Sequence, residues 1–222
     1  MINTLDDYIR HSLPAHGNFE TNPNLTSKVA KDGSLLSYKG NTVVFLLNDE
    51  VKERLKAVQD SLYSQAGDML AEKLQPDTFH MTLHDLINGK PDQANLDERM
   101  KVAEKHSAEI ISLWKGRPDI RMEATCLFNM VNTSIVLGLR PADAASWHTL
   151  DEMYMELEKV VHLGYGLSPH ITMAYFLPGC HDQSLMQRLS SAMIEVKMDL
   201  CLSAKDLALQ NFTDMNNYRS VL

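Results

Sequence analysis

Several features that would classify the chain at once are missing from its 222 residues. It has no apolar run of the roughly 18 residues that a membrane-spanning helix needs, so we expect no such helix. Its N-terminal segment, MINTLDDYIR, is acidic and has no apolar core, so a secretory signal is not expected. Three widely spaced cysteines, Cys126, Cys180 and Cys201, are too few for a disulfide scaffold. Together with 13 methionines they predict a reducing, cytoplasmic location.

Positive charge is scarce as well. The chain carries 21 Lys and Arg residues against 29 Asp and Glu residues, a formal net charge of -8. An acidic protein repels long polyanions, because nonspecific nucleic-acid binding depends on neutralising many phosphates. A local basic pocket can still hold one or two phosphates. The charge therefore favours a small nucleotide, or a short RNA end, over long nucleic acid as a partner. The chain also lacks a P-loop, a glycine-rich dinucleotide motif and a nucleophile elbow.

What the sequence does contain is an alternation of strand and helix patterns, typical of an α/β or α+β fold. Residues 34–38 and 42–47 flank Lys39-Gly40-Asn41 and predict a hairpin. A short helix is predicted at 5–13. Apolar residues spaced three and four apart predict further helices, and apolar runs predict further strands. The helices are expected at 51–70, 96–114, 147–161 and 185–192, and the strands at 78–86, 120–128, 134–139, 169–177, 197–202 and 207–212.

These elements occur twice in the same order. His170 follows His80 by 90 residues, and the same shift carries residues 44–47 onto the corresponding strand of the second unit. One such unit cannot bury its sheet alone, so the copies should pack together. We predict a single domain over 1–222, with a first lobe at 34–128 and a second at 132–213. The lobes would be duplicated βαβ-type units whose antiparallel-rich sheets line a central cleft about a pseudo-twofold axis.

Two short motifs stand in the equivalent strands of the repeat, Phe79-His80-Met81-Thr82-Leu83 and Pro169-His170-Ile171-Thr172-Met173. Side chains two apart on a strand lie on one face, about 6–7 Å apart. Each strand thus offers an imidazole and a hydroxyl to the same side. Two such strands predict a cleft lined by two imidazoles and two hydroxyls.

This set of groups suits cleavage of a phosphodiester. In-line displacement at phosphorus needs one proton taken from the nucleophile and another given to the leaving oxygen. Histidine titrates near neutrality, so a neutral and a protonated imidazole can act as general base and general acid. Threonine hydroxyls can donate to the non-bridging oxygens. We expect neither a metal nor a cofactor, because a phosphodiester carries a single charge. The near-equivalent motifs leave open which histidine is the base.

At these residues the chain resembles the 2H phosphoesterases, the superfamily of bacterial 2′-5′ RNA ligases and cyclic nucleotide phosphodiesterases. Their hallmark is a pair of H-x-[ST]-x motifs about half a chain apart, matched by His80-Met81-Thr82-Leu83 and His170-Ile171-Thr172-Met173. The resemblance covers about 34–212 and implies a two-lobed fold, an acid–base pair in His80 and His170, and phosphate binding by Thr82 and Thr172.

The stretches 40–44 and 79–82 resemble a branch labelled cyclic phosphodiesterase-like. The resemblance implies hydrolysis of a 2′,3′-cyclic phosphate, or of a similar small nucleotide or sugar cyclic phosphodiester. The alternatives are RNA end processing, by 2′-5′ phosphodiester cleavage or ligation, and a non-catalytic nucleotide-binding module. A metallohydrolase is a third alternative, which chelation would distinguish.

Three residues need separate interpretations. Ligase-like members often have a basic residue five positions after the second histidine, where this chain has Tyr175. Tyr175 either stacks on a base or ribose or, as strand alternation favours, packs on the back of the sheet. Asn41 is explained by the predicted turn, with a substrate contact as the alternative. His84 is expected at the cleft rim or in a hydrogen bond to a neighbouring loop, because a strand separates it too far from His80 for a shared metal ion.

Overall fold

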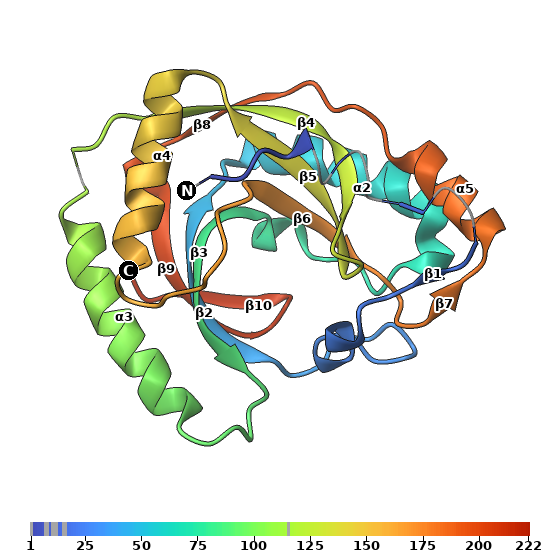
Figure 1. The fold of residues 1–222 in the computed structure, drawn as a ribbon, viewed down its shortest axis with the longest axis horizontal. Helices are drawn as coiled ribbons and strands as arrows, with labels where there is room; N and C mark the ends of the chain where they lie inside the picture. The colour runs from blue at the N-terminus through green and yellow to red at the C-terminus, as the bar shows by residue number, and fades with distance from the viewer. Residues whose placement is uncertain (1, 7–8, 10–12, 15–16, 115) are drawn as a thin grey trace.

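The computed structural model describes residues 2–6, 9, 13–14, 17–114 and 116–222, and these fold around one large β-sheet (Figure 1). The short helix predicted at 5–13 lies mostly outside the described residues. No helix within those ranges has the length and apolar character that crossing a membrane requires.

The central sheet has eight strands in the order β10-β9-β2-β3-β6-β5-β4-β8, and all neighbouring strands run antiparallel. Its strands are β2 (Lys39–Leu46), β3 (His80–Gly89), β4 (Ile120–Met130), β5 (Ser134–Pro141), β6 (His170–Tyr175), β8 (Asp199–Leu202), β9 (Leu207–Asp214) and β10 (Asn217–Ser220). A small second sheet pairs β1 (Phe19–Glu20) with β7 (Cys180–His181). The predicted mixed fold with antiparallel-rich strands is confirmed.

The two repeats exchange strands across the sheet. β3 and β6 meet at its centre, with β2 and β5 outside them, as a pseudo-twofold axis requires. β4, the last strand of the first repeat, pairs with β5 of the second, and β9 from the second repeat pairs with β2 of the first. The halves of the sheet therefore differ from the predicted lobes at 34–128 and 132–213, because each repeat places a final strand in the opposite half.

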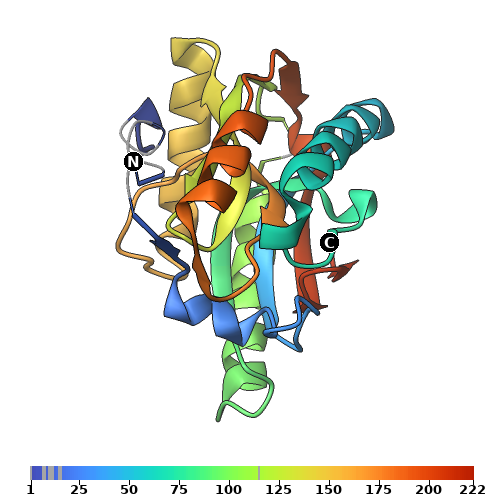
Figure 2. The same ribbon diagram turned by 90° about the vertical axis from the view of Figure 1, so that its right-hand side faces the viewer.

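Helices cover the sheet in two pairs. α3 and α4 lie together along one side, and α2 and α5 lie side by side at the other (Figures 1 and 2). Side chains that cap the first turns help to fix where they begin, as Asn48 does for α2 and Asp143 for α4. The helices are α2 (Asp49–Ala66), α3 (Leu96–Ser112), α4 (Ala144–Leu157) and α5 (Gln183–Ala192). Short 3-10 turns occupy Pro23–Ser27, Gly67–Met69, Pro76–Thr78 and Ala204–Asp206.

The predicted hairpin at 34–47 is wrong, because Lys39-Gly40-Asn41 begins strand β2 and makes no turn. Gly40 is needed for close packing: a Cβ atom there would lie 2.5 Å from the Phe212 ring and 2.7 Å from the Ile87 carbonyl. Asn41 follows inside the sheet and is fully buried. The turn was therefore predicted wrongly, because the glycine at position 40 is required by the neighbouring Phe212 ring and not by a turn.

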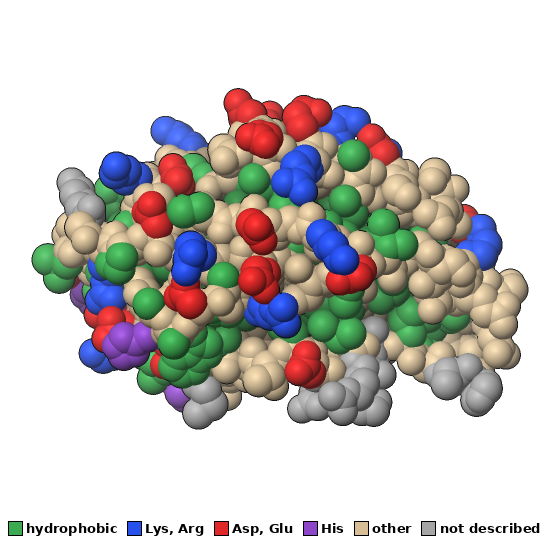
Figure 3. Space-filling view, turned by 90° about the horizontal axis from the view of Figure 1, so that it is seen from above, with side chains coloured by type: hydrophobic (Ala, Val, Ile, Leu, Met, Phe, Trp, Pro, Cys, Tyr) green, Lys and Arg blue, Asp and Glu red, His purple; other side chains and the backbone are tan. Residues whose placement is uncertain are grey.

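Charged side chains of both signs share the face seen in Figure 3, where Lys and Arg alternate with Asp and Glu. Charges of opposite sign form ion pairs in the described part of the chain, as between Arg140 and Glu123 and between Arg117 and Glu156. On the face of Figure 3 no continuous band of basic residues is seen.

Candidate active site

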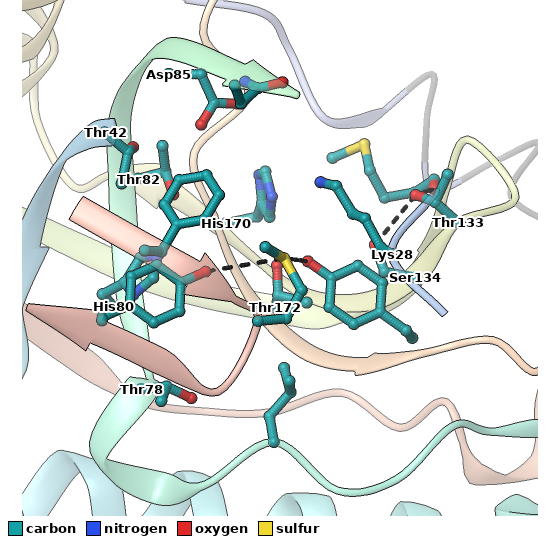
Figure 4. Close-up of a pocket in the computed structure, with 17 residues that line it drawn as sticks. Lys28, Thr42, Thr78, His80, Thr82, Asp85, Thr133, Ser134, His170 and Thr172 are labelled. Atoms are coloured by element: carbon teal, nitrogen blue, oxygen red, sulfur yellow. Dashed lines mark hydrogen bonds between the residues drawn. The ribbon is translucent and has the colours of Figure 1, made fainter. Parts of the chain in front are cut away.

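The strands that carry the two H-x-T motifs lie beside each other at the centre of the sheet. β3 and β6 are antiparallel and joined at one pair of residues, Met81 opposite Ile171. This register sets His80 across from Thr172, and His170 across from Thr82. All four side chains line one cavity of about 190 Å³, shown in Figure 4. The structure thus brings together the four motif residues singled out in the sequence.

The same cavity is lined by side chains from several other segments. They are Lys28, Thr42, Leu74, Thr78, Asp85, Asn88, Met130, Thr133, Ser134, Tyr175, Phe212, Met215 and Tyr218. Among the described lining residues, Lys28 is the one Lys or Arg and Asp85 is the one carboxylate. We call this cavity the cleft.

Matching irregularities occur in both motif strands just after the threonines. The pairing of β2 with β3 shifts at Leu83, and that of β5 with β6 shifts at Met173, 90 residues later. These are β-bulges, which place one extra residue in a strand and reset its alternation. As a result Asp85 and Tyr175, each five residues after a histidine, return to the cleft face.

The bulges correct two expectations. Strict alternation places Tyr175 on the back of the sheet, but the bulge at Met173 turns it into the cleft, where its hydroxyl donates to Met215 Sδ at 3.1 Å. His84 is turned the opposite way, into the interior. There its Nε2 lies 3.1 Å from Oε1 of Glu158, directly after α4, so the predicted hydrogen bond to a neighbouring segment is observed.

Asn41 is the one predicted site residue that the structure keeps out of the cleft. Its Nδ2 donates to the Met100 carbonyl at 2.9 Å, and its Oδ1 accepts from the Ile87 amide at 3.0 Å. The Ile87 amide lies where the β2–β3 register shifts a second time, so Asn41 satisfies a backbone donor that the bulge displaces from the ladder. Asn41 holds the strand in shape, and its amide is already occupied.

Both histidine rings are anchored by backbone groups two residues earlier in the chain. His170 Nδ1 lies 2.6 Å from the Ser168 carbonyl oxygen. Because that oxygen only accepts, Nδ1 carries the proton and Nε2 is the basic nitrogen of the neutral ring. His80 makes a corresponding hydrogen bond to the backbone of Thr78. The repeat thus preserves the orientation of the ring as well as its position.

The surroundings hold both imidazoles in the neutral form. Burial in the cleft lowers the pKa of His80 to about 4, although its backbone hydrogen bond and the charge of Asp85 oppose the shift. Burial likewise lowers the pKa of His170 below its usual value, against the same two kinds of opposing effect. A bound phosphate anion would favour protonation, so substrate binding is expected to raise both pKa values.

Lys28 brings positive charge into the cleft from the N-terminal segment. Its Nζ lies 5.0 Å from the ring centroid of Tyr38 and 5.9 Å from that of Tyr175. Burial alone would lower the pKa of Lys28, but the attraction of Tyr175, Asp85 and Tyr38 outweighs it and leaves this pKa raised. Lys28 therefore remains a cation in the cleft and can attract an anionic group.

The threonine hydroxyls of the cleft fall into two sets. Thr42, Thr78 and Thr133 donate to the carbonyl oxygens of His84, Gln75 and Met130 respectively. Within the described part of the chain, no such bond occupies the hydroxyls of Thr82 and Thr172. Those two hydroxyls are therefore the ones free to donate to a bound group between the histidines.

Sequence reasoning missed Lys28, Asp85 and Tyr218 as cleft residues. Asp85 had a signal, because the 90-residue shift relates it to Tyr175. Lys28 directly follows a short 3-10 turn, and Tyr218 belongs to the short strand β10. The ring of Tyr218 packs edge-on against that of His80, with the ring centroids 5.0 Å apart. Neither has a periodic pattern that would have found it.

Solved structures share this fold, whereas no model of a known protein family and no curated protein sequence matches the chain. A conserved protein of unknown function from Agrobacterium tumefaciens has a TM-score of 0.67 and 18% identity over 97% of each chain. LigT of Escherichia coli, complexed with 3′-AMP, has a TM-score of 0.53 and 11% identity over 83% of this chain and 96% of LigT. TT0787 of Thermus thermophilus has a TM-score of 0.51 and 12% identity over 82% of this chain and 95% of its own.

At these identities the likeness concerns the fold. What the chain shares with LigT is therefore the fold alone.

Proposed function

We propose that the chain is a phosphodiesterase that hydrolyses a small 2′,3′-cyclic phosphate by two-histidine acid–base catalysis. The observation that carries the proposal is the placement of His80, Thr82, His170 and Thr172 around one cleft on adjacent strands. A binding module would not need two titrating rings held in matched orientation. Hydrolysis does need them, because one proton must be removed and another supplied.

In the proposed reaction the phosphodiester lies between the two imidazoles. The neutral ring takes a proton from water as the water oxygen bonds to phosphorus, and the P–O bond to one sugar oxygen breaks on the opposite side. The protonated ring gives its proton to that leaving oxygen, which yields a phosphomonoester and a free hydroxyl. Thr82 and Thr172 donate to the non-bridging oxygens, where charge builds up. Lys28 offsets the charge of the phosphate.

The proposed reaction uses no metal. Protein metal sites usually gather three or more His, Cys, Asp or Glu side chains, and no such group is found among the described residues. A phosphodiester carries a single negative charge, which two hydroxyl donors and one ammonium group can hold.

The size and charge of the cleft support a small substrate. LigT, which shares the fold, was solved with 3′-AMP, a product-like nucleotide. RNA end processing is the second candidate, but it would call for further basic residues along the cleft, and the described lining offers only Lys28. We therefore propose a nucleoside cyclic phosphate ahead of an RNA end.

The test is to incubate EDTA-treated protein with the four nucleoside 2′,3′-cyclic monophosphates and follow phosphomonoester formation from about pH 3 to 9. A bell-shaped rate that disappears in His80→Ala and His170→Ala is the expected result. Activity that EDTA abolishes and zinc restores would replace this proposal with a metallohydrolase. Nucleotide binding without turnover at any pH would replace it with a binding module.

A further inference from the structure

A second chamber adjoins the cleft and has no role in the reaction described above. It measures about 370 Å³ and lies between β3, the β4–β5 turn and the segment from α4 to β6. Its lining includes Val131, Tyr154, Leu163, Tyr165, Gly166 and Leu167.

The chamber borders the cleft on the side of one histidine. Both spaces are lined by Thr82, Asp85, Met130 and His170, whereas His80 lines only the cleft. The cleft by itself, at about 190 Å³, is smaller than the roughly 300–1,000 Å³ typical of small-molecule sites. With the chamber added, the combined space falls within that range.

The walls of the chamber differ chemically from those of the cleft. The cleft presents imidazoles, hydroxyls and Lys28, which suit a phosphate, whereas the chamber presents mainly aliphatic and aromatic side chains. Tyr165 is 59% exposed and Val131 is 55% exposed, so two large apolar side chains on its rim are left open to solvent. Exposed apolar surface beside a polar site is typical of ligand binding.

Val131 also has a backbone conformation that its side chain disfavours. Its φ is +45°, and the following residue, Asn132, has a φ of +61°. Asn tolerates this left-handed region, but a β-branched residue is strained there. A strained, exposed valine at the rim of a chamber indicates a role in contacting a ligand.

We infer that this chamber is the subsite for the nucleobase of the substrate, with the base against Tyr165 and the apolar wall of Val131, Leu163 and Leu167. The inference rests on the proposed function and specifies its substrate as a nucleoside cyclic phosphate, in preference to a sugar phosphate without a base. Every nucleobase has a flat face that can stack on an aromatic ring. Asp85, where the two spaces meet, can accept a hydrogen bond from the ribose.

The position of the base also orients the reaction. A nucleoside seated in the chamber places its ribose next to His170, so the leaving sugar oxygen faces His170 and the attacking water lies toward His80. His170 then gives the proton to the leaving oxygen as general acid, and His80 removes a proton from water as general base. The two near-identical motifs thereby acquire different roles.

The test compares a ligand with a base and a ligand without one. Calorimetry would measure binding of adenosine 3′-monophosphate and of methyl ribofuranoside 3-phosphate to the wild type, Tyr165→Ala, Tyr165→Phe and Trp147→Ala. Trp147 is a matched control, an aromatic residue that is 44% exposed on α4 and does not line the chamber. We expect the wild type to bind the nucleotide about tenfold more tightly, Tyr165→Ala to lose this preference, and Tyr165→Phe and Trp147→Ala to keep it.

A second variant separates loss of the subsite from damage to the fold. Val131→Asn removes an apolar wall and puts a residue suited to positive φ in its place, so it should raise the melting temperature while weakening nucleotide binding. Equal binding of the two ligands by the wild type would overturn the inference, as would a Tyr165→Ala variant that weakens both ligands alike. Turnover of the base-free cyclic phosphate reports on the catalytic proposal separately, because it needs the cleft and not the chamber.

Discussion

The two motif strands are almost the same in backbone and very different in surroundings. β3 and β6 each carry a histidine anchored two residues back, a threonine on the same face and a bulge that returns the fifth residue to the cleft. At that fifth position β3 has Asp85 and β6 has Tyr175. The histidines differ in their neighbours too. Tyr218 packs on His80, whereas His170 borders the chamber.

This comparison separates what the repeat supplies from what the rest of the chain adds. The duplicated strands supply a symmetric set of imidazole and hydroxyl groups. Elements outside the repeat make the set asymmetric, because Lys28 enters from the N-terminal segment and Tyr218 from β10. A substrate is itself asymmetric, with water attacking on one side and a sugar oxygen leaving on the other. In the proposed reaction the asymmetric surroundings would therefore assign the acid and base roles that the motifs alone leave undecided.

The largest expected effect comes from removing either imidazole. His80→Ala and His170→Ala should each lower kcat/KM for a nucleoside 2′,3′-cyclic phosphate by at least about 1,000-fold, because each ring moves one proton in the transition state. His148→Ala, on an exposed face of α4, is the control and should leave the rate unchanged. Steady-state kinetics with circular dichroism would check both points. Near-normal turnover in either variant would rule out a paired mechanism.

A substrate that needs no proton on its leaving group should break the symmetry between the histidines. Nitrophenolate leaves as a stable anion, so with bis(p-nitrophenyl) phosphate the general acid is dispensable and the general base is not. We expect His170→Ala to regain about 100-fold of its lost activity relative to His80→Ala. The ratio of the two variants' rates on activated and natural substrates measures this. Equal recovery in both variants would contradict the assigned orientation.

The threonines should show smaller and more nearly equal effects. Thr82→Val and Thr172→Val keep the shape of the side chain but remove the hydroxyl donor, and each should lower kcat about 100-fold. Thr82→Ser and Thr172→Ser should restore most of the rate, since they return the donor. Thr42→Val is a useful comparison, because the Thr42 hydroxyl already donates to the His84 carbonyl. A loss of kcat in Thr42→Val as large as in the other two would indicate a purely structural effect.

Strand periodicity predicted the two motif strands because it is a local property. The apolar runs at 78–86 and 169–177 correspond to β3 and β6, and a spacing of two placed each histidine with its threonine. The same rule failed at Tyr175, since a bulge is set by the register with the neighbouring strand. At this bulge the carbonyl of Met173 accepts a hydrogen bond from the buried side chain of Gln59 in α2. The two residues are 114 positions apart in the sequence, so a local pattern does not predict the contact.

The remaining differences also depend on tertiary structure. Gly40 indicated a turn, yet the Phe212 ring from β9 is what requires a glycine there. The sequence repeat could not predict that β4 and β9 exchange between the halves of the sheet, because the order of strands along the chain does not determine their order in the sheet. The chemistry of the motifs could be read locally, but the shape of the cleft could not.

The smallest expected effect concerns pH, where Asp85 and Tyr175 again differ. Burial lowers the pKa of His80 to about 4 and that of His170 below its ordinary value, and the charge of Asp85 offsets part of both shifts. The base must be neutral and the acid protonated, so kcat/KM should peak between about pH 4 and 6.5 and fall on either side.

Asp85→Asn removes the negative charge, lowers both pKa values further and should move the whole profile to lower pH. Tyr175→Phe removes no charge, because burial raises the pKa of Tyr175 and keeps it neutral, so its profile should stay in place. A profile that moves equally in both variants would show that the fifth position acts through packing and not through charge.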